Sequence, residues 1–440
     1  MSKQSKHDRA WQQVFERTSL LSQLETTGYA YISAHELKTF GQREPRLMAK
    51  QDTLHSRPAI FRQHQLAILP VENGQYVIFR DRAHKSYFNL TSVLDDMPKE
   101  LYTSAHDLYS FDTYPSNQRL SESQAIDFSY VSLLLHTFLK EEQLHLTLRG
   151  RLRSGNFHFT LPDSQANINV SGVQIEVDSG YESHKKIYLI EAKVGKRDDF
   201  HIRQLFYPYL EWSQRSRKEI VPIFLIYSNA QYYLLQFRLS RIFGELTITK
   251  KACYSVNESP RAAISFSQLL HEIPVDESEP SIPYPQADDL DKVVDCVQLL
   301  AGGMHTKADI AEYFDFDERQ GDYYLNAATY LGYLERTGRE FTVTALGQHF
   351  TETRSRTERT ESLVIQLIKK PTFRDVFQRM FTEETSHLRL FKDYVAANEL
   401  DKYKLGRTIQ AHTSLNEGTA LRRALTMKAW IGWVLKNCEY

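Results

Sequence analysis

Apolar runs of the β type dominate the middle of the chain. They stand at Phe157–Leu161, Val173–Asp178, Ile187–Ala192, Val221–Ser228 and Tyr232–Leu239. Helical spacing covers Glu122–Lys140, with Ser121 as its N-cap, and also Asp198–Ser216, which lies between the third and fourth runs. The order of one helix, three strands, one helix and two strands predicts an α/β (α+β) fold, with a mixed sheet and helices on its faces.

The first 115 residues form a separate pattern. Trp11–Thr26 has helical spacing, and Ser33 with Glu36 resembles a capping box that opens a second, short helix. Leu66–Pro70 and Tyr76–Arg80 then alternate as two strands. Helices followed by a hairpin predict a winged-helix-like DNA-binding module over residues 1–115.

A proline-rich, acidic stretch over residues 273–289 predicts a linker between residues 116–272 and a mostly helical domain over residues 290–440. Beyond it, Leu290–Leu300 is amphipathic, Thr306 caps a short helix, Arg319–Leu334 forms a longer one, and Phe341–Thr344 resembles half of a wing. This order is typical of a winged helix-turn-helix.

Composition changes this picture little. The 440 residues suffice for two to four domains, and the 41% hydrophobic and 25% charged residues are ordinary for a soluble protein. A net charge of −1 gives no global sign of nucleic-acid binding, although a local basic stripe would serve. The three distant cysteines favour neither zinc nor disulfides. We expect a cytoplasmic protein, because no apolar run reaches the roughly 18 residues of a membrane span and the N-terminus lacks a secretion signal.

The strongest chemical pattern joins two neighbouring strands. Gln174, Glu176 and Asp178 share one face of the first strand, and Glu191 and Lys193 share a face of the second. The short stretch between the strands fits an antiparallel hairpin. We therefore expect three acids, a glutamine and a lysine to converge on one side of the sheet.

Such a group suits phosphodiester hydrolysis. Carboxylates bind Mg²⁺, which prefers hard oxygen ligands and acidifies a bound water. The carbonyl of Ala192 offers a further oxygen, and Lys193 can orient the water or meet negative charge on the phosphate. The alternative is a hairpin whose polar face carries ordinary solvated charges.

This pattern resembles the PD-(D/E)XK nuclease superfamily, which has an acid on one strand and (D/E)-x-K on the next. The resemblance implies that Asp178 and Glu191 bind Mg²⁺ and that Lys193 is catalytic, with Glu176 as a rival or additional ligand. Val177 stands where the superfamily name has proline. Gln204 lies in a stretch that resembles the supporting helix after the E-x-K strand.

Three groups of side chains are candidates for DNA contact. Arg149, Arg151 and Arg153 alternate as a basic ridge beside the proposed site. The other two groups are Arg43, Arg46 and Lys50 around a proline in the first module, and Arg319 and Gln320 at the start of the C-terminal recognition helix.

Together these features resemble one group of type II restriction endonucleases. The resemblance implies Mg²⁺-dependent, sequence-specific cleavage of double-stranded DNA by a homodimer, with a cognate DNA methyltransferase as genetic partner. Two alternatives remain: a recombination or transposase-subunit nuclease with the same core, and a non-catalytic DNA-binding regulator whose acidic hairpin is structural.

Overall fold

The computed structural model describes residues 5–115, 120–304, 306–314, 316–381, 388 and 390–440. The first four residues and the predicted domain boundary at residue 116 lie outside this part of the chain. The described residues form two compact units. The first unit comprises Met1–Pro98, Ser121–Tyr227 and Tyr233–Cys253, and the second comprises Lys99–Leu120, Ser228–Tyr232 and Tyr254–Tyr440.

The first unit begins with helices around a small antiparallel sheet of order β1-β3-β2. These elements are α1 (Lys6–Arg17), α2 (Leu20–Thr27), β1 (Tyr29–Ser33), α3 (Ala34–Gly41), α4 (Pro45–Ala49), α5 (Ala59–His64), β2 (Leu66–Glu72) and β3 (Gln75–Arg80). The capping box of Ser33 and Glu36 is confirmed at the start of α3. The single helix predicted over Trp11–Thr26 is wrong, because Thr18 is extended and separates α1 from α2. Strand β1 was not predicted.

A seven-stranded sheet of order β5-β14-β13-β12-β10-β9-β6 is the largest element of the chain. Its strands are β5 (Lys99–Tyr102), β6 (His145–Arg153), β9 (Gln174–Glu182), β10 (Lys186–Val194), β12 (Glu219–Ser228), β13 (Gln231–Leu239) and β14 (Leu246–Val256). Strand β10 pairs antiparallel with β9 and parallel with β12. The sheet is therefore mixed, and the fold is mixed α/β, as predicted.

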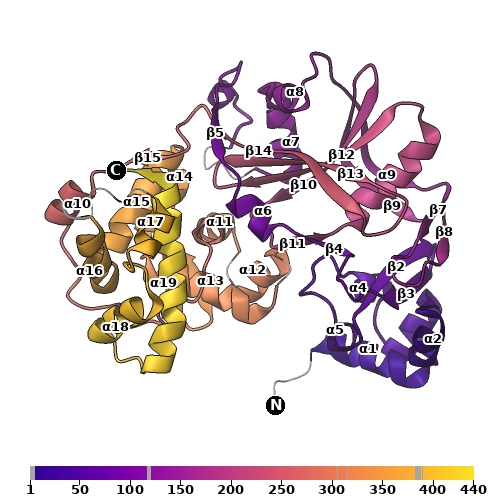
Figure 1. Ribbon diagram of the computed structural model, residues 1–440, viewed down its shortest axis with the longest axis horizontal. Coiled ribbons are helices and arrows are strands. Elements are labelled where there is room, and N and C mark those ends of the chain that lie inside the picture. The colour runs from indigo at the N-terminus through magenta and orange to yellow at the C-terminus, as the bar shows by residue number, and fades with distance from the viewer. Residues whose placement is uncertain (1–4, 116–119, 305, 315, 382–387, 389) are drawn as a thin grey trace. The chain divides into compact units, whose positions relative to one another are not determined.

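Helices α7 (Glu122–Val131) and α9 (Arg203–Arg215) both pack against β9 and β10 (Figure 1). Ser121 caps α7 as predicted. The helix predicted to run to Lys140 ends earlier, because Leu133 adopts a left-handed conformation (φ 63°) before α8 (Leu134–Leu139). The remaining elements are β4 (Tyr87–Asn89), α6 (Thr91–Asp95), β7 (Asn156–Thr160), β8 (Asn167–Ser171) and β11 (Asp199–His201). Because β11 precedes α9, the predicted helix start at Asp198 is wrong.

The second unit is mostly helical. Its elements after β5 are η1 (Leu108–Ser110), β15 (Ala262–Ala263), α10 (Phe266–Glu272), α11 (Leu290–Ala301), α12 (Lys307–Phe314), α13 (Glu318–Tyr330), β16 (Leu334–Thr337), β17 (Glu340–Val343), α14 (Ala345–Glu352), α15 (Arg356–Lys369), α16 (Pro371–Met380), α17 (Phe391–Ala396), α18 (Lys402–His412), α19 (Glu417–Asn437) and β18 (Cys438–Glu439). Residues 273–289 contain neither helix nor strand, as expected of a linker. The Thr306 hydroxyl accepts the Asp309 N–H at 3.2 Å and so caps α12 as predicted.

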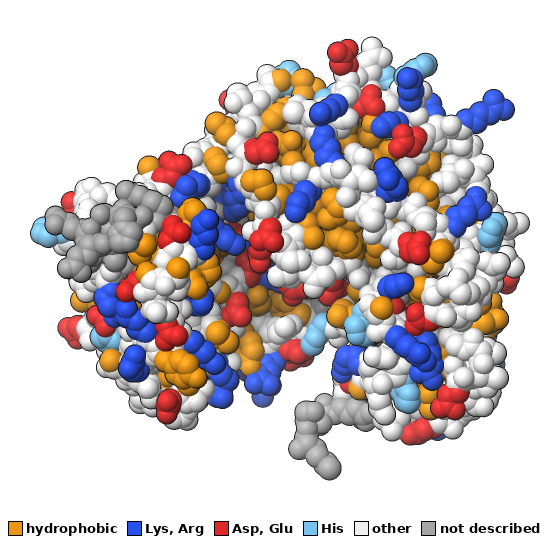
Figure 2. All heavy atoms as spheres, in the orientation of Figure 1, with side chains coloured by type: hydrophobic (Ala, Val, Ile, Leu, Met, Phe, Trp, Pro, Cys, Tyr) orange, Lys and Arg blue, Asp and Glu red, His pale blue; other side chains and the backbone are white. Residues whose placement is uncertain are grey.

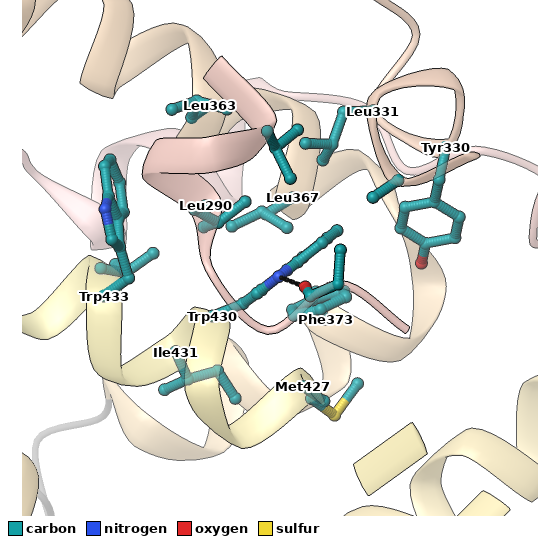
Figure 3. Packing of buried hydrophobic residues seen from close by; sticks show 14 of the residues in the cluster. Leu290, Tyr330, Leu331, Leu363, Leu367, Phe373, Met427, Trp430, Ile431 and Trp433 are labelled. Atoms are coloured by element: carbon teal, nitrogen blue, oxygen red, sulfur yellow. Dashed lines mark hydrogen bonds between the residues drawn. The ribbon is translucent and has the colours of Figure 1, made fainter. Parts of the chain in front are cut away.

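The apolar core of the second unit surrounds Trp430 of α19. Its ring stacks on Phe373, with 5.7 Å between centroids, and its indole N–H donates to the Ala287 carbonyl at 2.6 Å (Figure 3). The linker residue Ala287 is thereby tied to the core. All three cysteines of the chain are free and buried.

A buried arginine network lies beside this core; we define it as Arg356, Arg359, Glu258, Asn229 and Asn437. Arg356 is fully buried and donates to the Pro260 carbonyl and the Asn437 side chain. Glu258 accepts the backbone N–H groups of Arg356 and Thr357 at 2.7 and 2.8 Å. Arg359 donates to the Thr353 carbonyl at 2.7 Å and to Asn229 at 3.4 Å. These charges are thus held by polar groups of the protein itself.

No helix in the described part of the chain combines the length and the apolarity that crossing a membrane requires.

Candidate active site

The two acid-bearing strands separate at Asp178 and Glu191. The last antiparallel pair of β9 and β10 is Ser179 with Ile190, so these two acids come one residue after it. Strand β10 keeps its parallel pairing with β12 as far as Val194. The hairpin itself is as predicted, and its two acids lie where the strands part.

A β-bulge lies at the same point. The register of β6 with β9 passes from Leu148–Gly180 to Gly150–Val177, so two steps on β6 match three on β9. Bulges re-aim side chains and occur beside active sites. Here a carboxylate oxygen of Asp178 accepts the Ala192 N–H at 2.8 Å. The alternation predicted from Gln174 to Asp178 is present in the burial of these residues and ends after Asp178, where three consecutive residues are buried.

Glu191, Lys193 and Gln204 are hydrogen-bonded to one another. Glu191 is only 7% exposed, and its Oε1 accepts from Lys193 Nζ at 2.5 Å and from Gln204 Nε2 at 2.8 Å. Lys193 Nζ also donates to the Ala192 carbonyl at 3.1 Å. Gln204 comes from the first turn of α9, and its buried Oε1 has no hydrogen-bond partner. Two strands and a helix therefore meet around one carboxylate.

The sequence analysis missed a fourth acid, Glu122. It lies in the first turn of α7, with Oε1 at 3.9 Å from Lys193 Nζ. The N-cap Ser121 predicted the helix start and thereby the position of Glu122 within the helix. No local signal in the sequence predicted which strand the first turn of α7 would face.

Burial changes the proton affinities of these groups. It raises the pKa of Glu191 to about 7, with Lys193 opposing and Asp178 adding to the shift. It also raises the pKa of Glu122. Burial alone lowers the pKa of Lys193, but the attraction of Glu191 and Glu122 outweighs it, and the pKa is raised. Lys193 is therefore an ammonium ion among acids at neutral pH.

The remaining predicted residues near this site lie on or opposite β6. Arg151 pairs with Glu176 at 3.2 Å, on side chains that are 59% and 52% exposed. Arg149 pairs with Asp127 at 2.5 Å, and Arg153 donates to the Gly172 carbonyl at 3.2 Å. Gln174 is exposed and lies opposite Arg153. The structure thus joins Glu176 to the basic ridge, and it brings Asp178, Glu191, Lys193 and Gln204 together.

The other predicted DNA contacts lie on separate elements. Arg46 belongs to α4, Arg43 precedes this helix and Lys50 follows it, with Lys50 Nζ 3.8 Å from Asp52. Arg319 and Gln320 occupy the first turn of α13, in the second unit.

The oxygen atoms of the site match the ligands that Mg²⁺ prefers. Asp178 and Glu191 supply carboxylates and Ala192 a carbonyl, and Mg²⁺ retains several waters in such sites. Among the described residues, no group of three or more His, Cys, Asp or Glu side chains is arranged to hold a metal. Lys193 Nζ already contacts Glu191 Oε1 and the Ala192 carbonyl, so these oxygens gather around a positive charge. The oxygens are thus of the kind that Mg²⁺ binds, while the described residues offer no ready arrangement of three side-chain ligands around a cation.

Comparison with known families places three matches along the chain. Residues 8–78 match a domain of unknown function (DUF6996), residues 84–255 a second (DUF6997), and residues 292–439 a third (DUF7226). No curated protein and no solved structure matches the chain. The site described above lies wholly within the second match.

Proposed function

We propose that the chain is a Mg²⁺-dependent endonuclease of the PD-(D/E)XK type that cleaves double-stranded DNA at a specific sequence, as type II restriction enzymes do. The observation that carries the proposal is the buried Glu191, which Lys193 and Gln204 both contact and beside which Asp178 emerges from a bulge. Burial of charged side chains lowers the stability of the folded protein, and a functional role explains why this chain retains them.

Each side chain has a distinct role in this proposal. Asp178, Glu191 and the Ala192 carbonyl would hold Mg²⁺, which when bound supplies an acidified water and positive charge for the phosphate. Lys193 orients the attacking water or meets the charge that develops on the phosphate. Gln204 fixes the orientation of the Glu191 carboxylate, and Glu122 holds Lys193. Glu176, paired with Arg151, is the additional candidate ligand.

The modules around the site would bind the substrate. We propose that the helices and hairpin before the sheet form one winged-helix module, and that α12, α13, β16 and β17 in the second unit form another. We infer that they position a DNA duplex, that the enzyme acts as a homodimer in the cytoplasm, and that a cognate methyltransferase protects the host DNA.

Plasmid cleavage tests this proposal. Purified protein should cut supercoiled DNA with Mg²⁺ and not with EDTA, and Glu191→Ala or Lys193→Ala should lower the rate at least about a hundred-fold. Lys186→Ala is the matched control, since Lys186 lies on the same strand in an exposed pair with Glu219. Cleavage in EDTA, or full activity of both variants, contradicts the proposal.

Two further outcomes identify the alternatives. A wild-type protein that binds DNA but never cleaves it is the non-catalytic regulator. Cleavage together with flanking transposition genes, in place of a flanking methyltransferase gene, identifies the recombination nuclease.

A further inference from the structure

Two helices of the second unit bring basic side chains together at their N-terminal ends. The rings of Tyr330 on α13 and Trp430 on α19 are 6.3 Å apart in the core (Figure 3). Tyr323 and Arg423 each lie seven residues before these rings. Seven residues are about two helical turns, so each belongs to the same face of its helix as the ring that follows it.

Three arginines meet at this point. Arg319 Nε donates to the Tyr323 hydroxyl, and the Arg319 guanidinium carbon is 5.5 Å from the centre of the Tyr323 ring. Arg423 is half-buried; burial lowers its pKa, and the positive charges of Arg422 and Arg319 lower it further. Arg423 therefore lies within electrostatic reach of both Arg422 and Arg319.

These three arginines have no carboxylate partner among the residues that the structure describes. The acids nearest on α13 are engaged elsewhere: Glu318 pairs with Lys307 at 3.7 Å and Asp322 with Arg336 at 3.8 Å. Figure 2 shows Lys and Arg side chains gathered over the end of α19 next to α13. An anion from outside the chain would relieve the repulsion.

We propose that Arg319, Arg422 and Arg423 form a binding site for the phosphate groups of a DNA backbone. The choice of DNA rests on the proposed nuclease function. Guanidinium groups match phosphate oxygens in a bidentate manner, and an array of three suits a polyanion better than a single small anion. Phosphate contacts fix the register of a protein on DNA and carry no base information. The site would thus orient α13, whose first turn also carries Gln320, on the duplex.

The salt dependence of DNA binding tests this site. Binding of a fluorescein-labelled duplex in EDTA, followed by anisotropy over a series of salt concentrations, compares the full-length protein with R422Q/R423Q. Each lost phosphate contact lowers the slope of log K against log salt by about 0.9, so we expect a decrease of about 1 to 2. At about 0.1 M salt the same loss weakens binding roughly ten- to sixty-fold.

Two further variants complete the experiment. K369Q/K436Q removes two charges from the last turns of α15 and α19, not from the N-terminal turns that carry Arg319 and Arg422, and should keep the wild-type slope. R422K/R423K keeps both charges and should retain most of the slope, which separates charge from folding. An unchanged slope in R422Q/R423Q, or an equal decrease in K369Q/K436Q, overturns the inference.

The readouts for this site and for the nuclease centre differ. A protein that binds DNA through these arginines but does not cut it contradicts only the proposed nuclease function. A protein that cuts DNA with an unchanged salt slope in R422Q/R423Q contradicts only the phosphate site.

Discussion

Both units bury charged side chains, but they do so differently. In the arginine network of the second unit, Arg356 and Glu258 are bonded to carbonyls, backbone N–H groups and amides. In the first unit, Lys193 lies among Glu191, Glu122 and Asp178, and burial raises the pKa of both glutamates. Hydrogen bonds with neutral groups hold most of the network, although Arg356 Nε has no hydrogen-bond partner among the described residues, whereas the site places one lysine among three acids.

The contrast gives a criterion that separates structural buried charges from those that are candidates for chemistry. Buried ions whose donors and acceptors are fixed by backbone groups stabilise one arrangement of the chain. Buried acids whose counter-charge is a single mobile side chain can exchange that charge for another cation. By this criterion the network is structural, and the group around Glu191 is the candidate for chemistry.

The largest effect should come from breaking the network. Arg356→Leu leaves the Pro260 carbonyl without its donor and Asn437 Oδ1 with Lys99 as its remaining donor, and we expect the free energy of unfolding to fall by about 3 kcal/mol. Chemical denaturation measures this change. Glu361→Gln, at an exposed position of α15, should stay within about 0.5 kcal/mol of wild type. If Arg356→Leu left the free energy of unfolding unchanged, the structural role of the arginine network would be contradicted.

Replacing the lysine of the site should have a smaller and reversible effect. Lys193→Met leaves Glu191 and Glu122 without their counter-charge, and we expect a loss of about 2 kcal/mol in EDTA. Saturating Ca²⁺ should restore the lost stability, because a ligand at about a hundred times its Kd adds about 2.7 kcal/mol to the free energy of unfolding. Thermal melts with and without Ca²⁺ measure both changes. Ca²⁺ should stabilise Arg356→Leu no more than it stabilises the wild type. If Ca²⁺ also stabilised Lys193→Met no more than the wild type, the exchange of Lys193 for a cation would be contradicted.

Acid should affect the first unit before the second. Burial, with the charges of Arg203 and Arg57, holds the pKa of His201 well below 6.5, so the unfolded chain takes up a proton that the folded chain does not. The contribution of His201 to stability therefore falls as the pH drops below about 6.5, by up to about 2 kcal/mol at about pH 5, whereas the raised pKa of Glu191 acts in the opposite direction. Burial alone raises the pKa of Glu258, but hydrogen bonds from Ser355 and Thr357 lower it, and this contribution is lost only below its ordinary pKa of 4.5.

Hydrogen exchange of each unit at several pH values tests this difference. His201→Asn keeps an acceptor for the Arg203 N–H but does not titrate, so the first unit of this variant should keep more of its protection at about pH 5 than that of the wild type. A simultaneous loss of protection in both units near neutral pH would contradict the assignment.

Local patterns predicted the elements well. The hairpin of β9 and β10, the caps at Ser33, Ser121 and Thr306, and the pairing of Glu191 with Lys193 all follow from spacing along the chain. These features depend on neighbours within a few residues, where alternation and capping act.

Features that depend on distant partners were missed. Strand β6 alternates leucines with polar residues, but its pairing with β9 carries register shifts that its own sequence does not encode. Leu133 adopts its left-handed conformation without glycine. Glu122 joins the site through the packing of α7 on β10, which only the folded sheet determines.

The bulge on β9 makes this site sensitive to the length of the chain as well as to its side chains. Strand β6 takes two steps where β9 takes three, and Asp178 lies within that surplus. A preceding shift of the opposite sense compensates this surplus, because β6 and β9 each advance four residues between the pairs Leu146–Tyr181 and Gly150–Val177. Loss of one codon at Ser179 would therefore put the two strands out of register and would move the Asp178 carboxylate away from the Ala192 N–H, although every acid and the lysine would still be encoded. In-frame deletions at this point of the gene should therefore abolish the function of the protein.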